Sequence, residues 1–285
     1  MRPFPLPSGL TRPPRRPGRR RLALWLPLGL AVCAALVAGS ALRGAGADVP
    51  TAANPPSNNA TNPTPKLEED GYDWAGRHQE ILDIKDRVHP ELVFIGDSIT
   101  HAWGGLPETG ARRTGEEVLR AAFPGRRILN LGFGWDRTQN VLWRLEHGEL
   151  DGLHPRAVVI HIGSNNTSAT RNARQNTPDE IAAAIVRIVE QVHAKAPAAR
   201  ILLMAVFPRE ERPDHPRRRQ IGEINRWLRA QAGQVPGVVW IDLGPKLTRP
   251  DGTISREIMS DFCHPTARGY QIWADSVNGQ LGWTP

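Results

Sequence analysis

The stretch Glu91-Leu-Val-Phe-Ile-Gly-Asp-Ser-Ile-Thr100 joins a short apolar run to a turn that carries a hydroxyl group. The run from Leu92 to Ile95 predicts a buried strand, and the glycine after it permits a sharp change of direction. A serine held rigidly just past a strand end is well placed to act as a nucleophile. Asp97 and Ser98 are also residue types that cap helices. This stretch alone therefore leaves a nucleophile and a helix cap both open.

Apolar runs of this kind recur along the chain and alternate with amphipathic stretches. Strands are predicted at 92–95, 127–130, 157–161, 201–206 and 238–241, and helices near 74–86, 114–122, 136–147, 178–195, 215–232 and 266–280. Runs such as Ala157–Ile160 and Ile201–Met204 are apolar on both faces, which is typical of parallel strands covered by helices on both sides. The pattern predicts an α/β fold, a three-layer α/β/α sandwich around a five-stranded parallel sheet.

The basic balance of the chain is confined to its start. The 285 residues carry 36 Lys and Arg against 29 Asp and Glu, a formal net charge of +7. Residues 1–47 hold eight of the arginines and no acid, so the remainder carries 28 basic and 29 acidic residues. A nucleic-acid partner requires a basic face on the folded domain. We therefore expect no nucleic-acid partner.

Residues 1–47 have the layout of an export signal. A segment rich in Arg and Pro precedes the uncharged residues 22–42, and Ala45-Gly-Ala47 resembles a cleavage site. The uncharged run is also long enough to span a bilayer, so a signal peptide and an uncleaved signal anchor are both open. Either one would export the body, to the periplasm or outside the cell, and the anchor would be its contact with the membrane.

The residues after the leader divide into a linker and a body. Residues 48–66 are rich in Pro, Asn, Thr and Ala, which predicts a flexible linker. From 67 to 285 the composition is globular, and we expect one domain. The two cysteines, Cys33 and Cys263, would be separated by cleavage of the leader, so no intrachain disulfide is expected in the mature protein.

Polar segments follow the predicted strands, where sites form in sandwiches of this type. They are Gly96-Asp-Ser98, Asn130-Leu-Gly-Phe-Gly-Trp-Asp136, Gly163-Ser-Asn-Asn166 and Phe207-Pro-Arg209, with Asp261-Phe-Cys-His264 before the last predicted helix. Taken singly, each segment fits a turn or a cap. Together they supply a hydroxyl nucleophile, a base, a carboxylate and oxyanion donors, which are the groups that acyl transfer needs.

In their order and spacing, four of these segments resemble the four blocks of the GDSL-type SGNH hydrolases. The segment Asn140–Leu150 is also similar to the catalytic subunits of intracellular platelet-activating-factor acetylhydrolase and their bacterial relatives. The resemblance covers about residues 72–280. It implies an SGNH-hydrolase fold of flavodoxin-like type and a serine esterase that works without a cofactor.

The resemblance implies a catalytic triad. Ser98 would be the nucleophile, His264 the base that takes its proton, and Asp261 the carboxylate that fixes the imidazole. The short spacing of Asp261 and His264 lets a single loop hold both. We expect His264 to lie within about 3.5 Å of the Ser98 hydroxyl.

The same resemblance implies an oxyanion hole. Its donors would be the N–H of Ser98, an N–H of the second block and the side chain of Asn165. The donor glycine of the family is replaced here by Trp135, which follows Gly134, so the sequence leaves open which of these two donates. We also expect the indole of Trp135 to narrow the pocket or to stack on a substrate ring.

Further residues are expected to bind the substrate. They are Asp97, Trp135, Asn166 and Arg209, which lie in or beside the blocks. None of the nine histidines has a neighbour at a spacing suited to a zinc pair, and no metal is expected.

These expectations combine in an exported serine esterase that hydrolyses short acyl esters through an acyl-serine, and the acyl group that we expect is acetyl. Export, the linker and tryptophan near the site favour an acetylated carbohydrate, so the expected partner is a glycan or small-molecule ester. One alternative is a phospholipid or platelet-activating-factor-like acetylhydrolase or a lysophospholipase. Another is a catalytically idle domain that binds glycans. The oligomeric state is not predicted.

Overall fold

The computed structural model describes residues 59–232 and 234–283. Five parallel strands form one sheet in the order β2-β1-β3-β4-β5, which confirms the predicted five-stranded parallel sheet. The strands are β1 (Leu92–Gly96), β2 (Ile128–Gly132), β3 (Ala157–His161), β4 (Arg200–Met204) and β5 (Val238–Ile241).

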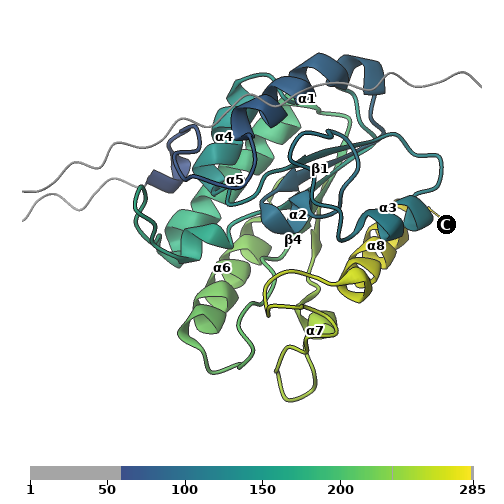
Figure 1. Ribbon diagram of the computed structural model, residues 1–285. Helices are drawn as coiled ribbons and strands as arrows, with labels where there is room; N and C mark the ends of the chain where they lie inside the picture. The colour runs from purple at the N-terminus through teal and green to yellow at the C-terminus, as the bar shows by residue number, and fades with distance from the viewer. Residues whose placement is uncertain (1–58, 233, 284–285) are drawn as a thin grey trace, which may run out of the picture. The chain divides into compact units, whose positions relative to one another are not determined.

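Helices cover both faces of this sheet. One face carries α1 (Trp74–Val88), α4 (Thr138–Glu146), α5 (Pro178–Lys195) and α6 (Pro216–Ala232), and the other carries α3 (Glu116–Ala122) and α8 (Ala267–Leu281) (Figure 1). Successive strand residues point to opposite faces. Val93 and Ile95 accordingly pack with the first group of helices, and Leu92 and Phe94 with the second. Both faces are therefore apolar, as a three-layer sandwich requires.

The six predicted helices are present, and four short elements were not predicted. These are η1 (Asn59–Thr61), α2 (Ser98–His101), η2 (Asn165–Thr167) and α7 (Gly244–Leu247). Two strands also end two residues away from the predicted position. The second strand runs on to Gly132 because Gly132 pairs with Gly96, and the fourth ends at Met204, the last residue that pairs with the short β5.

The N-terminal segment, residues 59–72, corrects the predicted linker. The prediction placed residues 48–66 in a flexible linker, but Ala60 is fully buried, and the main-chain N–H of Thr64 donates to the carbonyl of Gln139 at 3.1 Å. The side chain of Lys66 is also almost fully buried, with 2% of it exposed. These contacts fix residues 59–66 on the domain, which therefore begins before residue 67.

The leader and the start of the linker, residues 1–58, lie outside the described residues, and so do the predicted signal sequence and anchor. Within 59–232 and 234–283, no helix combines the length and the apolar character needed to cross a membrane.

The strand order decides where the site forms. The chain passes from β1 to β2 on one side and then to β3 on the other, so β1 lies between them. The carboxyl ends of these three strands meet at one edge of the sheet, which is where open α/β sheets bind their ligands. The first three polar segments of the sequence are thereby brought together.

Candidate active site

Ser98, His264 and Asp261 form a continuous hydrogen-bonded row. The Oγ atom of Ser98 lies 2.8 Å from Nε2 of His264, although the two residues are 166 positions apart. Nδ1 of the same ring lies 2.7 Å from Oδ2 of Asp261. The predicted proximity of His264 to the Ser98 hydroxyl is confirmed. Such a row can transfer the serine proton to the imidazole and stabilise the imidazolium that results.

The loop that carries Asp261 and His264 is held by its own carboxylate. Oδ1 of Asp261 accepts the main-chain N–H groups of Cys263 at 3.0 Å and His264 at 2.7 Å. Phe262, which lies between Asp261 and Cys263, has φ 61°, and its carbonyl accepts the N–H of Glu210 at 2.8 Å. Burial works to raise the pKa of Asp261, but the hydrogen bonds from His264 outweigh it and lower the pKa. The carboxylate is therefore ionised where it meets the imidazole.

The turn after β1 is both a helix cap and a nucleophile position. Oδ1 of Asp97 accepts the N–H of Ile99 at 3.0 Å and so caps α2. Ser98 is the first residue of that helix, where a main-chain N–H has no intrahelical acceptor. A Cβ on Gly96 would overlap the Thr100 side chain and the carbonyl of His161, so only glycine fits there. Both interpretations of the opening stretch therefore describe the same turn.

The main-chain N–H groups of Gly134 and Trp135, in the second block, differ in whether they already form a hydrogen bond. The N–H of Gly134 donates to Nδ1 of His101 at 3.1 Å, so Gly134 is wrong as an oxyanion donor in this conformation. Within residues 59–232 and 234–283, the N–H of Trp135 forms no hydrogen bond, which leaves it as the candidate. Burial lowers the pKa of His101 to about 2, so its ring stays neutral and accepts this bond. Trp135 has φ 62°, a backbone conformation that favours glycine.

Asn165 connects the third block to the second. Its Nδ2 donates one hydrogen to the carbonyl of Asp136 at 2.9 Å. A side-chain amide carries two N–H donors, so one remains for a ligand. The structure therefore brings Asn165 and the second block together, as the prediction of a shared oxyanion hole requires.

Two predicted substrate-binding residues have structural contacts instead. Asp97 is fully buried, and burial raises its pKa to about 6, against opposing effects of the Ile99 N–H and the His264 charge. Asn166 is also fully buried. Its Nδ2 donates to Thr138 and Asn176, and its Oδ1 accepts the N–H of Thr138 at 3.0 Å. Neither side chain is accessible, so both predictions are wrong, and the hydrogen bonds of both residues hold the loops that carry the site.

Arg209 lies beside the site. Its Nη1 is 3.4 Å from Oγ of Ser164, and its charge acts to lower the pKa of Asp97 and of Cys263. Burial nevertheless raises the pKa of Cys263 to about 11, so this thiol stays protonated. A contact between Arg209 and substrate remains a prediction.

Sequence reasoning assigned no role to a buried ionic network under the second block. Arg144 is fully buried, and its Nε donates to Oδ2 of Asp136 at 2.9 Å. Nη1 of Arg144 donates to Oε2 of Glu149. Oε1 of Glu149 lies 2.9 Å from Nδ1 of His78. Oδ1 of Asp136 accepts the Trp74 indole N–H at 2.8 Å. Two members of this network, Arg144 and Glu149, lie in the segment Asn140–Leu150, and their charges in an otherwise helical pattern are the sequence feature that could have indicated it.

The ionisation of Asp136 depends on this network. Burial raises the pKa of Asp136 to about 6, and Arg144 and Trp74 act against the rise. Because Asp136 follows Trp135 and its carbonyl accepts a hydrogen bond from Asn165, the network supports two of the three candidate oxyanion donors, Trp135 and Asn165. In the described residues no three His, Cys, Asp or Glu side chains are grouped so as to hold a metal ion.

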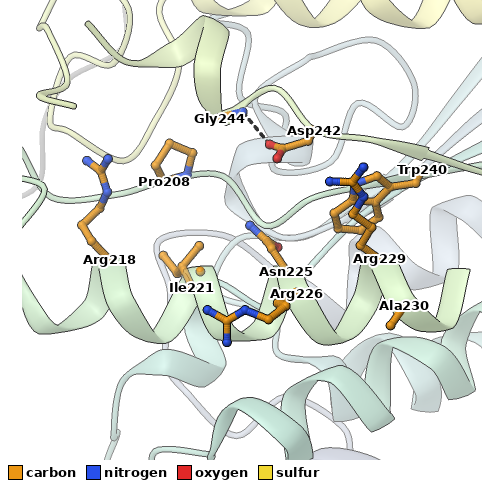
Figure 2. A pocket seen from close by; sticks show the side chains of 11 residues that line it. Pro208, Arg218, Ile221, Asn225, Arg226, Arg229, Ala230, Trp240, Asp242 and Gly244 are labelled. Carbon is orange, nitrogen blue, oxygen red and sulfur yellow. Dashed lines mark hydrogen bonds between the residues drawn. The ribbon is translucent and has the colours of Figure 1, made fainter. Parts of the chain in front are cut away.

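Two pockets differ in their relation to these residues. One of about 560 Å³ is bounded by Trp135, by Leu67–Glu69 and by Thr170–Asn172. Another of about 690 Å³ lies between α6 and β5, where Figure 2 shows Arg218, Asn225 and Arg229 on the same side of the helix as Trp240. No predicted site residue lines the second pocket. Of these two pockets, the one at Trp135 adjoins the candidate active site.

Comparisons with known proteins agree with this geometry. Residues 94–272 match the model of the GDSL-like lipase/acylhydrolase family. The chain is 34% identical over 215 residues to platelet-activating factor acetylhydrolase IB subunit alpha1 of Rattus norvegicus, covering 75% of this chain and 84% of that protein. The alpha2 subunit of the same species is 32% identical over 216 residues, covering 75% and 86%. A solved acetylxylan esterase from Geobacillus stearothermophilus shares the fold, with a TM-score of 0.53 and 24% identity over 68% of this chain and 95% of that one.

Proposed function

Because the chain belongs to the GDSL-like lipase/acylhydrolase family and is a carboxylic ester hydrolase, we propose that Ser98 is its nucleophile and that it removes acetyl groups. The observation that carries the first part is the hydrogen-bonded row of Ser98, His264 and Asp261. A catalytically idle glycan-binding domain would have no need of this row.

The reaction runs in two halves. Nε2 of His264 takes the proton of Ser98 as Oγ attacks the ester carbonyl carbon, and the carbonyl π electrons move to the oxygen. When this tetrahedral intermediate collapses, the alcohol leaves with the proton held by His264, and the acyl group stays on Ser98. A water molecule then gives its proton to His264 and attacks the acyl-serine. The second collapse releases the carboxylic acid and returns the proton to Ser98.

Three donors stabilise the negative oxygen in both halves. They are the main-chain N–H groups of Ser98 and Trp135 and the free amide hydrogen of Asn165. Donors already aimed at the developing charge need no reorganisation during the reaction. Each such donor lowers the activation barrier by about 3–4 kcal/mol. Asp261 keeps the imidazole of His264 oriented and balances its charge.

The alcohol part of the substrate is a sugar in this proposal. Trp135 is half exposed, at 51%, and it follows the peptide that supplies an oxyanion donor. An exposed indole provides a flat apolar face on which a sugar ring can stack. The pocket beside it carries Glu68, Arg171 and Asn172, whose polar groups can meet hydroxyls. An acetyl group is supported by the relatives, which are named acetylhydrolases.

A second candidate substrate is an acetylated phospholipid. It is favoured by one observation, the 34% identity to a platelet-activating factor acetylhydrolase subunit over three quarters of the chain. The two candidates share the acyl group and differ in the alcohol.

Release of acetate from two substrates separates these candidates. Purified protein is incubated with acetylated xylo-oligosaccharides and with an acetylated phospholipid, and acetate is measured. We expect kcat/KM to be at least about tenfold higher for the oligosaccharide, since a lost stacking contact costs about 1–2 kcal/mol. A preference for the phospholipid contradicts the carbohydrate proposal, and a preference for longer acyl groups contradicts the acetyl proposal.

Export is also part of the proposal. Its support is the basic start, the uncharged residues 22–42 and the small residues before Asp48. Mass spectrometry of the mature N-terminus distinguishes a cleaved signal peptide from a membrane anchor, and an intact chain in the cytoplasm contradicts both.

A further inference from the structure

The peptide that joins Gly134 to Trp135 is held from the N-terminal segment. Nζ of Lys66 donates to the carbonyl of Gly134 at 3.0 Å, and the hydroxyl of Tyr72 lies 3.3 Å from the same oxygen. Both donors come from residues before β1, far from the second block in sequence. A Cβ on Gly134 would lie 2.7 Å from Oδ2 of Asp70, so the segment is packed directly against this glycine.

The side chain of Lys66 is almost completely buried, which is unusual for a lysine. Only 2% of its side chain and 7% of that of its ion-pair partner Asp70 are exposed. Nζ also lies 4.9 Å from the centre of the Tyr72 ring. A buried ammonium requires compensation, and here it has a carboxylate, a ring face and the carbonyl of Gly134.

The segment that carries Lys66 is fixed to both loops of the oxyanion hole. On the side of the second block, Nδ2 of Asn140 donates to the carbonyl of Thr64 at 3.0 Å. On the side of the third block, Nδ2 of Asn172 donates to the carbonyl of Leu67 at 3.0 Å. Residues 64–67 therefore have a defined position over the site.

Peptide geometry connects Lys66 to the reaction. The C=O of Gly134 and the N–H of Trp135 belong to one planar trans peptide and point in opposite directions. Two donors on the carbonyl therefore fix the direction of the N–H. A hydrogen bond from a cation is stronger than one from a neutral donor, and it polarises the peptide so that its N–H becomes a better donor.

We propose that Lys66, assisted by Tyr72, positions and polarises the Gly134–Trp135 peptide so that the Trp135 N–H serves the oxyanion hole. The proposal rests on the proposed function of Ser98. It makes the N-terminal segment part of the catalytic apparatus, with Lys66 as a positioning residue that does not touch substrate.

The test compares Lys66→Met with a matched control. Met keeps the apolar length of the side chain but removes the charge and the donor. Arg112→Met removes the other cation paired with Asp70, at 3.3 Å, and Arg112 donates no hydrogen bond to Gly134. With p-nitrophenyl acetate, we expect Lys66→Met to lower kcat/KM by about 10- to 100-fold, less than the loss of a whole donor, and Arg112→Met to change it less than about threefold.

An inhibitor separates positioning from general damage. An alkyl trifluoromethyl ketone forms a tetrahedral adduct with the serine and places an oxyanion in the hole. Its inhibition constant should rise in Lys66→Met by the same factor by which kcat/KM falls. Lys66→Arg, which keeps a cationic donor, should recover most of both losses. Thermal unfolding is measured for each variant, and if Lys66→Met does not fold, Tyr72→Phe and Lys66→Arg give the comparison.

The outcomes are distinct. Wild-type turnover in a folded Lys66→Met variant, or a loss in kcat/KM with unchanged inhibition, overturns the proposal for Lys66 and leaves Ser98 untouched. Should Lys66→Met not fold, Tyr72→Phe carries the test, since it removes the second donor to the Gly134 carbonyl. A fall in its kcat/KM matched by a rise in its inhibition constant supports the proposal, and wild-type values of both overturn it. A wild-type protein without esterase activity overturns the proposed function and this inference together.

Discussion

Nδ2 of Asn165 donates to the main-chain carbonyl of Asp136 at 2.9 Å and so joins the loop after β3 to the loop after β2. The bond uses one of the two amide hydrogens and directs the other. Asp136 is held in turn by Arg144 and Trp74 through its side chain. The amide of Asn165 on one loop is therefore oriented by the other loop, and the geometry of the proposed oxyanion hole depends on both.

Asn165→Ala should remove one oxyanion donor and leave the stability of the fold almost unchanged. Because Asn165 is partly exposed and has a single side-chain bond, we expect kcat to fall about 100- to 1,000-fold with little change in melting temperature. Its neighbour provides the control. Asn166→Ala breaks several buried hydrogen bonds and should cost about 2 kcal/mol or more of unfolding free energy. Steady-state kinetics and urea unfolding measure both, and comparable activity in the two variants would refute this division of roles.

Asp136→Asn and Glu149→Gln test the buried network from its two ends. Each weakens one ion pair of the fully buried Arg144, and each should destabilise the fold by about 3 kcal/mol. Of these two residues, Asp136 adjoins the proposed oxyanion hole. Only Asp136→Asn should therefore lower kcat, by about tenfold, under conditions where both variants are folded. Equal losses of kcat would mean that the network supports the fold without orienting the donors.

The pH dependence of stability should reflect Asp97. Its folded pKa of about 6 lies above the unfolded value, so the folded state holds a proton that the unfolded state loses first. The contribution of Asp97 to the free energy of unfolding is therefore fully present below about pH 4 and is lost as the pH rises through about 6. The whole contribution is about 3 kcal/mol. Asp97→Asn keeps the oxygen that caps α2, and because its amide does not titrate, its stability should not fall over this pH range. The variant should gain on the wild type between pH 4 and 6 in urea unfolding, whereas a constant difference across that range would show that Asp97 does not titrate there.

Trp135→Gly separates backbone strain from substrate contact. The left-handed φ of 62° costs a non-glycine residue about 1 kcal/mol, so the variant should melt about 2–4 °C higher. Trp135→Ala loses the same ring but keeps the strain and serves as the control. Both variants should lose kcat/KM on acetylated oligosaccharides by about tenfold while p-nitrophenyl acetate hydrolysis stays near wild type. Unchanged oligosaccharide hydrolysis would remove Trp135 from the substrate site.

The sheet could be predicted because its signals are local, whereas the pairing of Ser98 with His264, 166 positions away, is implied by the family resemblance. Apolar runs such as Ala157–Ile160 identify the strands, and chain order places their ends at one edge. Asp261 and His264 lie on one loop because three positions separate them, and that loop meets Ser98 through a bond of 2.8 Å.

The errors concern side chains whose partners are distant in sequence. Asn166 resembles a site residue because it follows Asn165, but its partners Thr138 and Asn176 bury it, and no local pattern identifies them. The polar composition of residues 59–66 is typical of a linker. Main-chain bonds such as that from Thr64 to Gln139 do not depend on composition, and they fix the segment on the domain.

The most direct test of the central claim is to locate the residue that a fluorophosphonate modifies. The wild-type protein is treated with the probe, its esterase activity is followed, and peptide mass spectrometry identifies the adduct. We predict one adduct, on Ser98, that forms in step with the loss of activity. Ser98→Ala should carry no adduct and should hydrolyse p-nitrophenyl acetate at least about 1,000-fold more slowly. Modification of another residue as activity disappears, or wild-type turnover by Ser98→Ala, would contradict the assignment of Ser98 as the nucleophile.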